Sequence, residues 1–113
     1  DGAVESMLSR LGALMYASHL SYSRIGLGSD ATDKLVELVQ LEGTQSGLHG
    51  AKITGGGSGG TVCVLGAAGQ QAEEAFARVL NAYQRETGRQ PYVVQGSSQG
   101  ALEFGYAVLR PVR

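Results

Sequence analysis

The feature that most constrains this fold is a glycine loop at residues 55–60, where five of six residues are glycine and one is serine. The flanking runs at 51–54 and 61–65 are rich in Val, Ile and Thr and lack a helical period, so they are predicted to be strands. Glycine adopts positive φ without strain and lets another group approach the backbone. We therefore expect a strand–loop–strand unit whose backbone N–H groups suit an anionic or polyhydroxylated ligand.

Two phosphate-binding motifs do not fit this loop. Gly55, Gly57 and Gly60 satisfy G-x-G-x-x-G, but a dinucleotide-binding loop precedes a helix, whereas a predicted strand follows here. A Walker loop ends in Gly-Lys-Ser/Thr, and Gly60-Thr61 lacks the lysine. The remaining alternative is a flexible turn that only connects two strands of a hairpin. A hairpin turn needs just two residues, and this loop has six. The density of glycine favours close packing against a second body.

The composition bounds the chain to one ordinary globular domain. It has 113 residues, of which 42% are hydrophobic and 17% charged, enough for a single core. A net charge of −1 gives no electrostatic reason to expect nucleic acid or an anionic membrane as partner. We see no run of transmembrane length and no secretory signal, and we expect a cytoplasmic protein. The single cysteine, Cys63, lies in an apolar run and is expected to be a small buried residue.

Three helices are expected outside the strand–loop–strand unit. Residues 3–22 form one or two helices, with Gly12 marking a bend, and their apolar stripe comprises Val4, Met7, Leu8, Leu11, Leu14 and Met15. The second helix runs over 30–41, with Asp30 as N-cap and Asp33 completing a box-like pair. The third ends at Gly88, and its buried stripe comprises Ala72, Ala75, Phe76, Val79, Leu80 and Tyr83.

The order of elements predicts the fold class. Two further strands are expected at 92–94 and 106–109, after the third helix. Amphipathic helices of this kind bury one face on a small antiparallel sheet. We therefore predict an α+β two-layer sandwich, with a small antiparallel sheet and helices on one face.

Residues 50–60, Gly-Ala-Lys-Ile-Thr-Gly-Gly-Gly-Ser-Gly-Gly, closely resemble the third, C-terminal motif of the GHMP kinases. Two other segments agree with this resemblance. The run Met15-Tyr16-Ala17-Ser18-His19-Leu20-Ser21 is similar to a galactokinase segment that precedes the same loop. The Ser-Asp-x-Thr-Asp run at 29–33 and the tail after residue 95 are similar to plant-type L-arabinokinases, although Gln99 stands where proline is expected.

The resemblance implies a ferredoxin-like GHMP kinase C-terminal domain over residues 1–113, lacking the strand that usually precedes the first helix. It implies a fragment of a longer two-domain sugar kinase that phosphorylates an anomeric hydroxyl, with L-arabinose or galactose as substrate class. ATP and Mg²⁺ would serve the full-length enzyme, and the N-terminal domain of the same chain would be the partner. No catalytic residue, metal ligand or tightly bound cofactor is expected here, and the chain alone should be inactive.

The resemblance also implies one wall of the ATP and sugar cleft. The residues that would line it are Thr54, Gly55, Gly56, Gly57, Ser58, Gly59 and Gly60. Three further side chains are candidate contacts. Lys52 suits a structural salt bridge as well as a phosphate, His19 suits a helix end or the domain interface, and Asp30 suits a cap or a sugar contact.

Other readings of the sequence stay open. The Gly-Leu-Gly-Ser run at 26–29 is tempting as an ATP loop, but it lies only about twenty residues before the third motif and its two acidic neighbours would repel a phosphate. The chain could instead be a stand-alone binding or interaction module without chemistry, or a small-molecule sensor with its own pocket. Self-association of the isolated chain is a further expectation.

Overall fold

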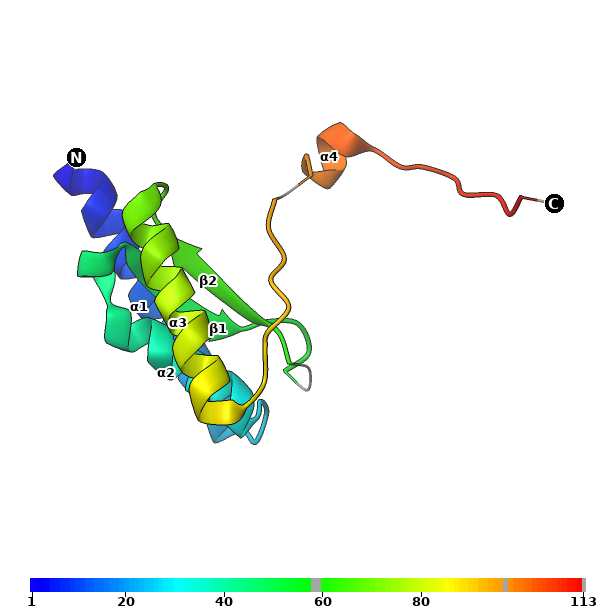
Figure 1. Ribbon diagram of the computed structural model, residues 1–113. Coiled ribbons are helices and arrows are strands. Elements are labelled where there is room, and N and C mark those ends of the chain that lie inside the picture. Colours follow the sequence, from blue (N-terminus) through cyan, green and yellow to red (C-terminus); the bar gives the residue numbers. More distant parts are fainter. Residues whose placement is uncertain (58–59, 97, 113) are drawn as a thin grey trace.

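The computed structural model describes residues 1–57, 60–96 and 98–112 and has the predicted α+β architecture (Figure 1). Two strands form an antiparallel hairpin, and three long helices pack around it. In chain order the elements are α1 (Gly2–Arg24), α2 (Asp30–Glu42), the short 3-10 helix η1 (Thr44–Ser46), β1 (Leu48–Ile53), β2 (Val62–Gly66), α3 (Gln70–Thr87) and α4 (Ala101–Phe104).

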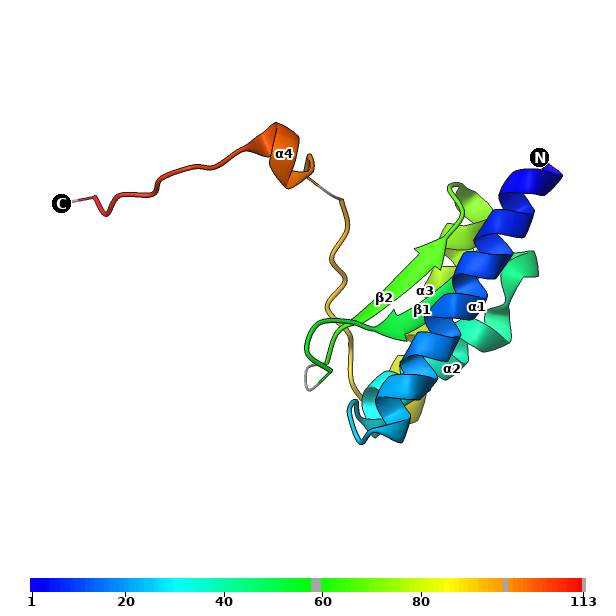
Figure 2. The ribbon, with the colours of Figure 1, turned by 180° about the vertical axis from the view of Figure 1, so that it is seen from behind.

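The β1–β2 hairpin places a strand on each side of the glycine loop, as predicted. Lys52 lies opposite Cys63, and Ile53 lies opposite Val62. Helices α2 and α3 cover one face of the hairpin, whereas α1 runs along β1 on the side away from β2 (Figures 1 and 2). Because β2 directly follows the loop, the dinucleotide-binding reading is excluded by the fold.

The core lies between the hairpin and helices α2 and α3. Ala51 and Ile53 of β1 are fully buried, as are Val39 of α2 and Ala75 of α3. The predicted inner face of α3 is confirmed, because Val79 and Tyr83 are also buried and Phe76 packs against the core from its edge. Every residue of β1 is buried except the half-buried Lys52, because α1 packs against this strand as well as α2 and α3, whereas β2 is only partly buried.

Helix α1 is continuous, but the face it buries differs from the predicted one. Four residues of the expected stripe are exposed, and we call them the α1 stripe: Val4, Met7, Leu11 and Leu14. The buried residues of α1 are Gly12 and His19. A Cβ at Gly12 would overlap the carbonyl oxygen of His49, so the two backbones touch at this point. The absence of a side chain lets α1 approach β1, and the contact face centres on Gly12 instead of on the leucines.

The N-cap of α2 is Ser29, and the prediction of Asp30 was wrong by one residue. Ser29 has extended backbone angles (φ −152°, ψ 160°), and its hydroxyl accepts from the amide of Thr32. The Thr32 side chain accepts from the Ser29 amide in return, which completes a capping box. Asp30 therefore lies in the first turn. Asp33 is left free for another contact.

Cys63 is exposed, so the expectation of a buried cysteine was wrong. It lies opposite Lys52, and Ala51 and Ile53 on either side of Lys52 face the core. Because strand side chains alternate, Cys63 points to the open face of the hairpin. The apolar neighbours in sequence belong to a strand with only one covered face.

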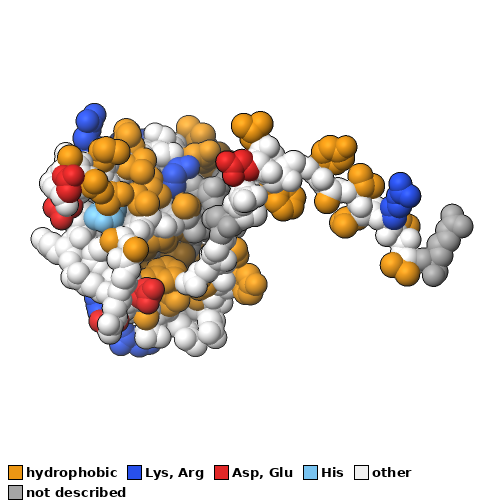
Figure 3. Space-filling model, turned by 90° about the horizontal axis from the view of Figure 1, so that it is seen from above, with side chains coloured by type: hydrophobic (Ala, Val, Ile, Leu, Met, Phe, Trp, Pro, Cys, Tyr) orange, Lys and Arg blue, Asp and Glu red, His pale blue; other side chains and the backbone are white. Residues whose placement is uncertain are grey.

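The strands expected at 92–94 and 106–109 are not formed in the part of the chain that the structure describes. After α3 the chain leaves the body and runs outward through the single turn of α4 (Figures 1 and 3). Tyr92, Val94 and Tyr106 are 91%, 79% and 90% exposed. A strand needs a neighbour to pair its backbone groups, and among the described residues the sheet contains only β1 and β2. Within the described ranges, no helix has the length and apolar character required to cross a membrane.

Candidate functional site

The glycine loop begins and ends on a backbone hydrogen bond. The amide of Thr54 donates to the carbonyl of Thr61 at 3.0 Å, extending the hairpin by one pair. Gly55 and Gly57 have φ of +75° and +79°, a region that favours glycine. Ser58 and Gly59 lie outside the described residues. The loop needs its glycines for backbone conformation at two described positions.

One side of the loop is open. At Gly55, Gly56 and Gly60 an added Cβ would meet no atom of the described residues within 4 Å, and all three residues are exposed. A hollow of about 280 Å³ adjoins Gly60, and its wall includes Ser29 at the start of α2 and the cation Arg89. A ligand can therefore approach the loop backbone closely from this side.

The other side of the loop is docked on the turn between α1 and α2. The amide of Gly28 donates to the carbonyl of Gly57 at 2.6 Å. Gly57 is buried, and a Cβ there would lie 2.9 Å from carbons of both Leu27 and Tyr22. This contact is the close packing that the glycine density predicted, although the second body is a turn of the same domain. The sequence does not predict this contact. Gly26 and Gly28 serve the turn itself, since both have positive φ (82° and 89°).

Lys52 lies beside the loop with its ammonium over an aromatic ring. Its Nζ is 5.3 Å from the centroid of Tyr22, within cation–π range. Among the described residues the Lys52 ammonium lies over this ring and forms no salt bridge with a carboxylate. The Lys52 side chain therefore lies next to the end of β1, where the glycine loop starts.

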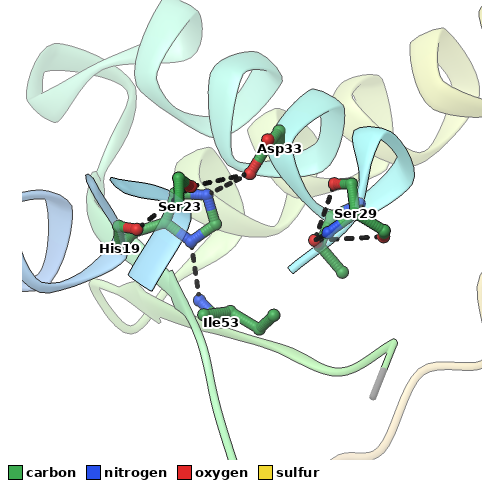
Figure 4. Close-up of polar contacts among 6 residues, drawn as sticks. His19, Ser23, Ser29, Asp33 and Ile53 are labelled. Atoms are coloured by element: carbon green, nitrogen blue, oxygen red, sulfur yellow. Dashed lines mark hydrogen bonds and ion pairs between the residues drawn. The ribbon is translucent and has the colours of Figure 1, made fainter. Parts of the chain in front are cut away.

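His19 is buried at the junction of three elements (Figure 4). Its Nδ1 accepts from the amide of Ile53 at 3.0 Å, and its Nε2 lies 2.8 Å from Oδ1 of Asp33. The Ser23 hydroxyl is 3.3 Å from the same carboxylate oxygen. Sequence reasoning selected His19 but assigned Asp33 to helix capping and did not consider Ser23. The i, i+4 spacing of His19 and Ser23 was the available signal.

The structure brings together most of the predicted site. His19, Lys52 and Thr54 all lie at the end of β1, where the glycine loop starts. Asp30 is exposed in the first turn of α2, away from the His19 contacts. Within the described ranges, no group of three or more His, Cys, Asp and Glu side chains is placed to hold a metal ion.

Comparison with known proteins identifies the family. The model of the family described as "GHMP kinases C terminal" matches residues 3–85, which include all of the hairpin, the glycine loop and helix α2. The chain belongs to the GHMP kinase C-terminal family. The GHMP kinase resemblance of the glycine loop and the α+β fold prediction are thereby confirmed.

The relatives of this GHMP kinase domain are kinases. It is 46% identical to the L-arabinokinase of Arabidopsis thaliana over 112 residues, which cover 94% of this chain and 11% of the relative. It is 39% identical to the galactokinase of Actinobacillus succinogenes, covering 84% of this chain and 24% of the relative. Identity to the mevalonate kinase of Saccharolobus solfataricus is 32%, over 69% of this chain and 24% of the relative. No solved structure matches.

Proposed function

We propose that this chain is the C-terminal domain of an ATP-dependent sugar kinase acting at the anomeric hydroxyl of a monosaccharide such as L-arabinose or galactose. The observation that carries the proposal is the glycine loop of a GHMP kinase domain, docked at Gly57 and open at Gly55 and Gly56. The identities to L-arabinokinase and galactokinase support a sugar as substrate, and the higher value favours L-arabinose.

In this proposal the loop forms one wall of an active site between two domains. Phosphoryl transfer depends on positioning the phosphates and on stabilising their charge. The open backbone at Gly55, Gly56 and Gly60 fits the approach of a phosphate or a sugar, and Lys52 supplies a nearby positive charge. The proposal assigns ATP, the Mg²⁺ ligands and the groups that activate the sugar hydroxyl to an N-terminal domain; this chain spans 11% to 26% of the kinases it matches.

The exposed α1 stripe supports the presence of a second domain that packs on α1 in the longer protein. Monomeric proteins seldom leave contiguous large hydrophobic residues in water, and such patches often mark interfaces. Val4, Met7 and Leu14 are 52%, 69% and 67% exposed on one side of α1. Contact with the N-terminal kinase domain would cover them.

A size and activity measurement tests the proposal. An antibody raised against this chain should detect a native product several times heavier than 11.7 kDa. That product, purified with ATP and Mg²⁺, should phosphorylate L-arabinose or galactose, and residues 1–113 alone should not. A native product near 11.7 kDa would overturn the proposal and favour a stand-alone binding module.

A matched pair of variants tests the role of the loop. Gly56→Val in the longer protein places a side chain on the open side, where Gly56 has no positive φ and its Cβ position has no described atom within 4 Å. We expect the kinase kcat/KM to fall by about a hundredfold, because a small misplacement of the substrates can lower the rate by this factor. Gly100→Val is the control, because it is equally open and lies in the tail. Equal activity of the two variants would remove the loop from the active site.

A further inference from the structure

His19 occupies the position where a neighbouring strand would otherwise bind β1. The Ile53 amide points away from β2, because the adjacent residue Thr54 makes the hairpin bond to Thr61 and alternate amides face opposite edges. Nδ1 of His19 accepts from this edge amide at 3.0 Å. A side chain of α1 therefore satisfies the last edge amide of β1, immediately before the glycine loop.

The same ring is held from its other side by α2. Nε2 lies 2.8 Å from Oδ1 of Asp33. The Ser23 hydroxyl lies 3.3 Å from the same carboxylate oxygen. Ser23 is also within 3.2 Å of the His19 carbonyl, so its single proton serves one of these two acceptors at a time. One imidazole thus links α1, α2 and β1 (Figure 4).

These contacts select one tautomer of the ring. An acceptor nitrogen carries no proton, so bonding to the Ile53 amide requires a bare Nδ1. The proton is then on Nε2 and is donated to the Asp33 carboxylate. The carboxylate orients the ring, and the ring holds the β1 amide. Loss of the ring would leave the Ile53 amide without this acceptor, and loss of the carboxylate would leave the ring without its orienting partner.

The glycine loop has two described anchors on this unit. Gly57 is bonded to Gly28 in the turn between α1 and α2, and Ile53 is bonded to His19 at the end of α1. We infer that His19, oriented by Asp33, is a positioning residue that sets where the glycine loop starts relative to α1 and α2. Its effect on catalysis rests on the proposed kinase function, but the positioning itself does not.

The imidazole nitrogens of the unmodified 113-residue chain give the first test. With ¹⁵N-labelled histidine, NMR should show His19 as a neutral ring protonated on Nε2, and a His49→Gln variant assigns the signals. This measurement requires neither a mutation at His19 nor kinase activity. A His19 ring protonated on Nδ1 would overturn the inference.

Two substitutions separate the contacts of the ring. In His19→Asn the side-chain oxygen takes the place of Nδ1 and can accept from Ile53, whereas in His19→Gln the amide nitrogen takes the place of Nε2 and can reach only Asp33. We expect amide hydrogen exchange at Ile53 to be about tenfold faster in His19→Gln than in His19→Asn. Equal exchange rates in the two folded variants would overturn the inference.

The longer protein extends the test to activity. There His19→Gln should lower kcat/KM by about tenfold more than His19→Asn, since only the former releases the start of the loop. If the longer protein phosphorylates no sugar, the proposed function fails while the NMR and exchange results still decide the role of His19. If it is an active kinase and the two variants are equal, the positioning role fails alone.

Discussion

Gly57 is the position in the glycine loop where a side chain is least compatible with the fold. Its φ is +79°, and an added Cβ would lie 2.9 Å from carbons of Leu27 and Tyr22. Gly57→Ala therefore combines a strained backbone with overpacking against the turn. We expect a loss of about 1–3 kcal/mol in the free energy of unfolding, measured by urea denaturation of the 113-residue chain.

Gly56→Ala is the matched control for Gly57→Ala. The two glycines are adjacent, but Gly56 lacks a positive φ and has open space at its Cβ position. We expect its free energy of unfolding to stay within about 0.5 kcal/mol of the parent chain. Similar losses at both positions would mean that the loop is not docked through Gly57.

The ion pair between Glu42 and Arg78 gives a residue-scale prediction about pH. Arg78 donates from Nε to Oε1 of Glu42 at 2.9 Å and from Nη2 to Oε2 at 3.0 Å. These hydrogen bonds lower the pKa of Glu42 against the opposing effect of its burial. Because the folded pKa lies below the unfolded one, the stabilisation is present at neutral pH and is lost as the pH falls through the folded pKa.

A double-mutant cycle of Glu42→Gln and Arg78→Met measures this effect. We expect a small favourable coupling at neutral pH, since part of the pair is exposed to water, and none at acid pH where Glu42 is protonated. The urea midpoints of the four proteins at the two pH values give the coupling. A coupling that persists in acid would contradict the pKa shift of Glu42.

At the scale of elements, the contact between α1 and β1 reverses the usual effect of a helix substitution. Gly→Ala inside a helix ordinarily stabilises by about 1 kcal/mol. At Gly12 the new methyl group would overlap the His49 carbonyl, a backbone atom that cannot move away as a side chain can. We expect Gly12→Ala to destabilise the chain by about 2 kcal/mol or more.

Gly2→Ala provides the comparison within the same helix. Gly2 is the first residue of α1 and has no atom within 4 Å of its Cβ position. The thermal midpoint of the Gly2→Ala variant should equal or slightly exceed that of the parent chain. If Gly12→Ala were also neutral, α1 would not lie on β1 as the structure has it.

The elements themselves were largely predictable from sequence, but their contacts were not. Periodicity located the α3 face of Val79 and Tyr83, and β-propensity located the hairpin around the glycine loop. The same periodicity gave the wrong face for α1, because Gly12 contributes nothing to a hydrophobic pattern yet permits the closest approach. Likewise, propensity predicted strands in the tail, but a strand forms only where another strand supplies hydrogen bonds.

The site was predictable in part for a similar reason. The glycine density predicted close packing, and the structure supplies it at Gly57. The packing partner could not be read from the sequence, since Gly28 and Leu27 lie about thirty residues away and carry no chemical signature. Asp33 was assigned to the cap of α2, and only the fold shows that its carboxylate faces His19.

At the scale of the whole molecule, the body and the tail differ in how well they bury apolar residues. The body has a core of fully buried residues, whereas the tail carries large hydrophobic side chains in water (Figure 3). Those in the tail include Tyr92 at 91%, Leu102 at 98% and Val112 at 99%. Segments with few buried contacts open at little cost in free energy and are the first to be cleaved by proteases.

Limited proteolysis should therefore separate the two parts. Brief treatment of the 113-residue chain with chymotrypsin should cut first at Tyr92, Tyr106 or Leu109, because these side chains are exposed and their backbone lies outside any helix or strand. Mass spectrometry should show a product retaining residues 1–88 intact, with the thermal midpoint of the uncut chain. First cleavage within α1 would contradict the expected order of opening, and a lower midpoint after the tail is removed would show that the tail stabilises the body.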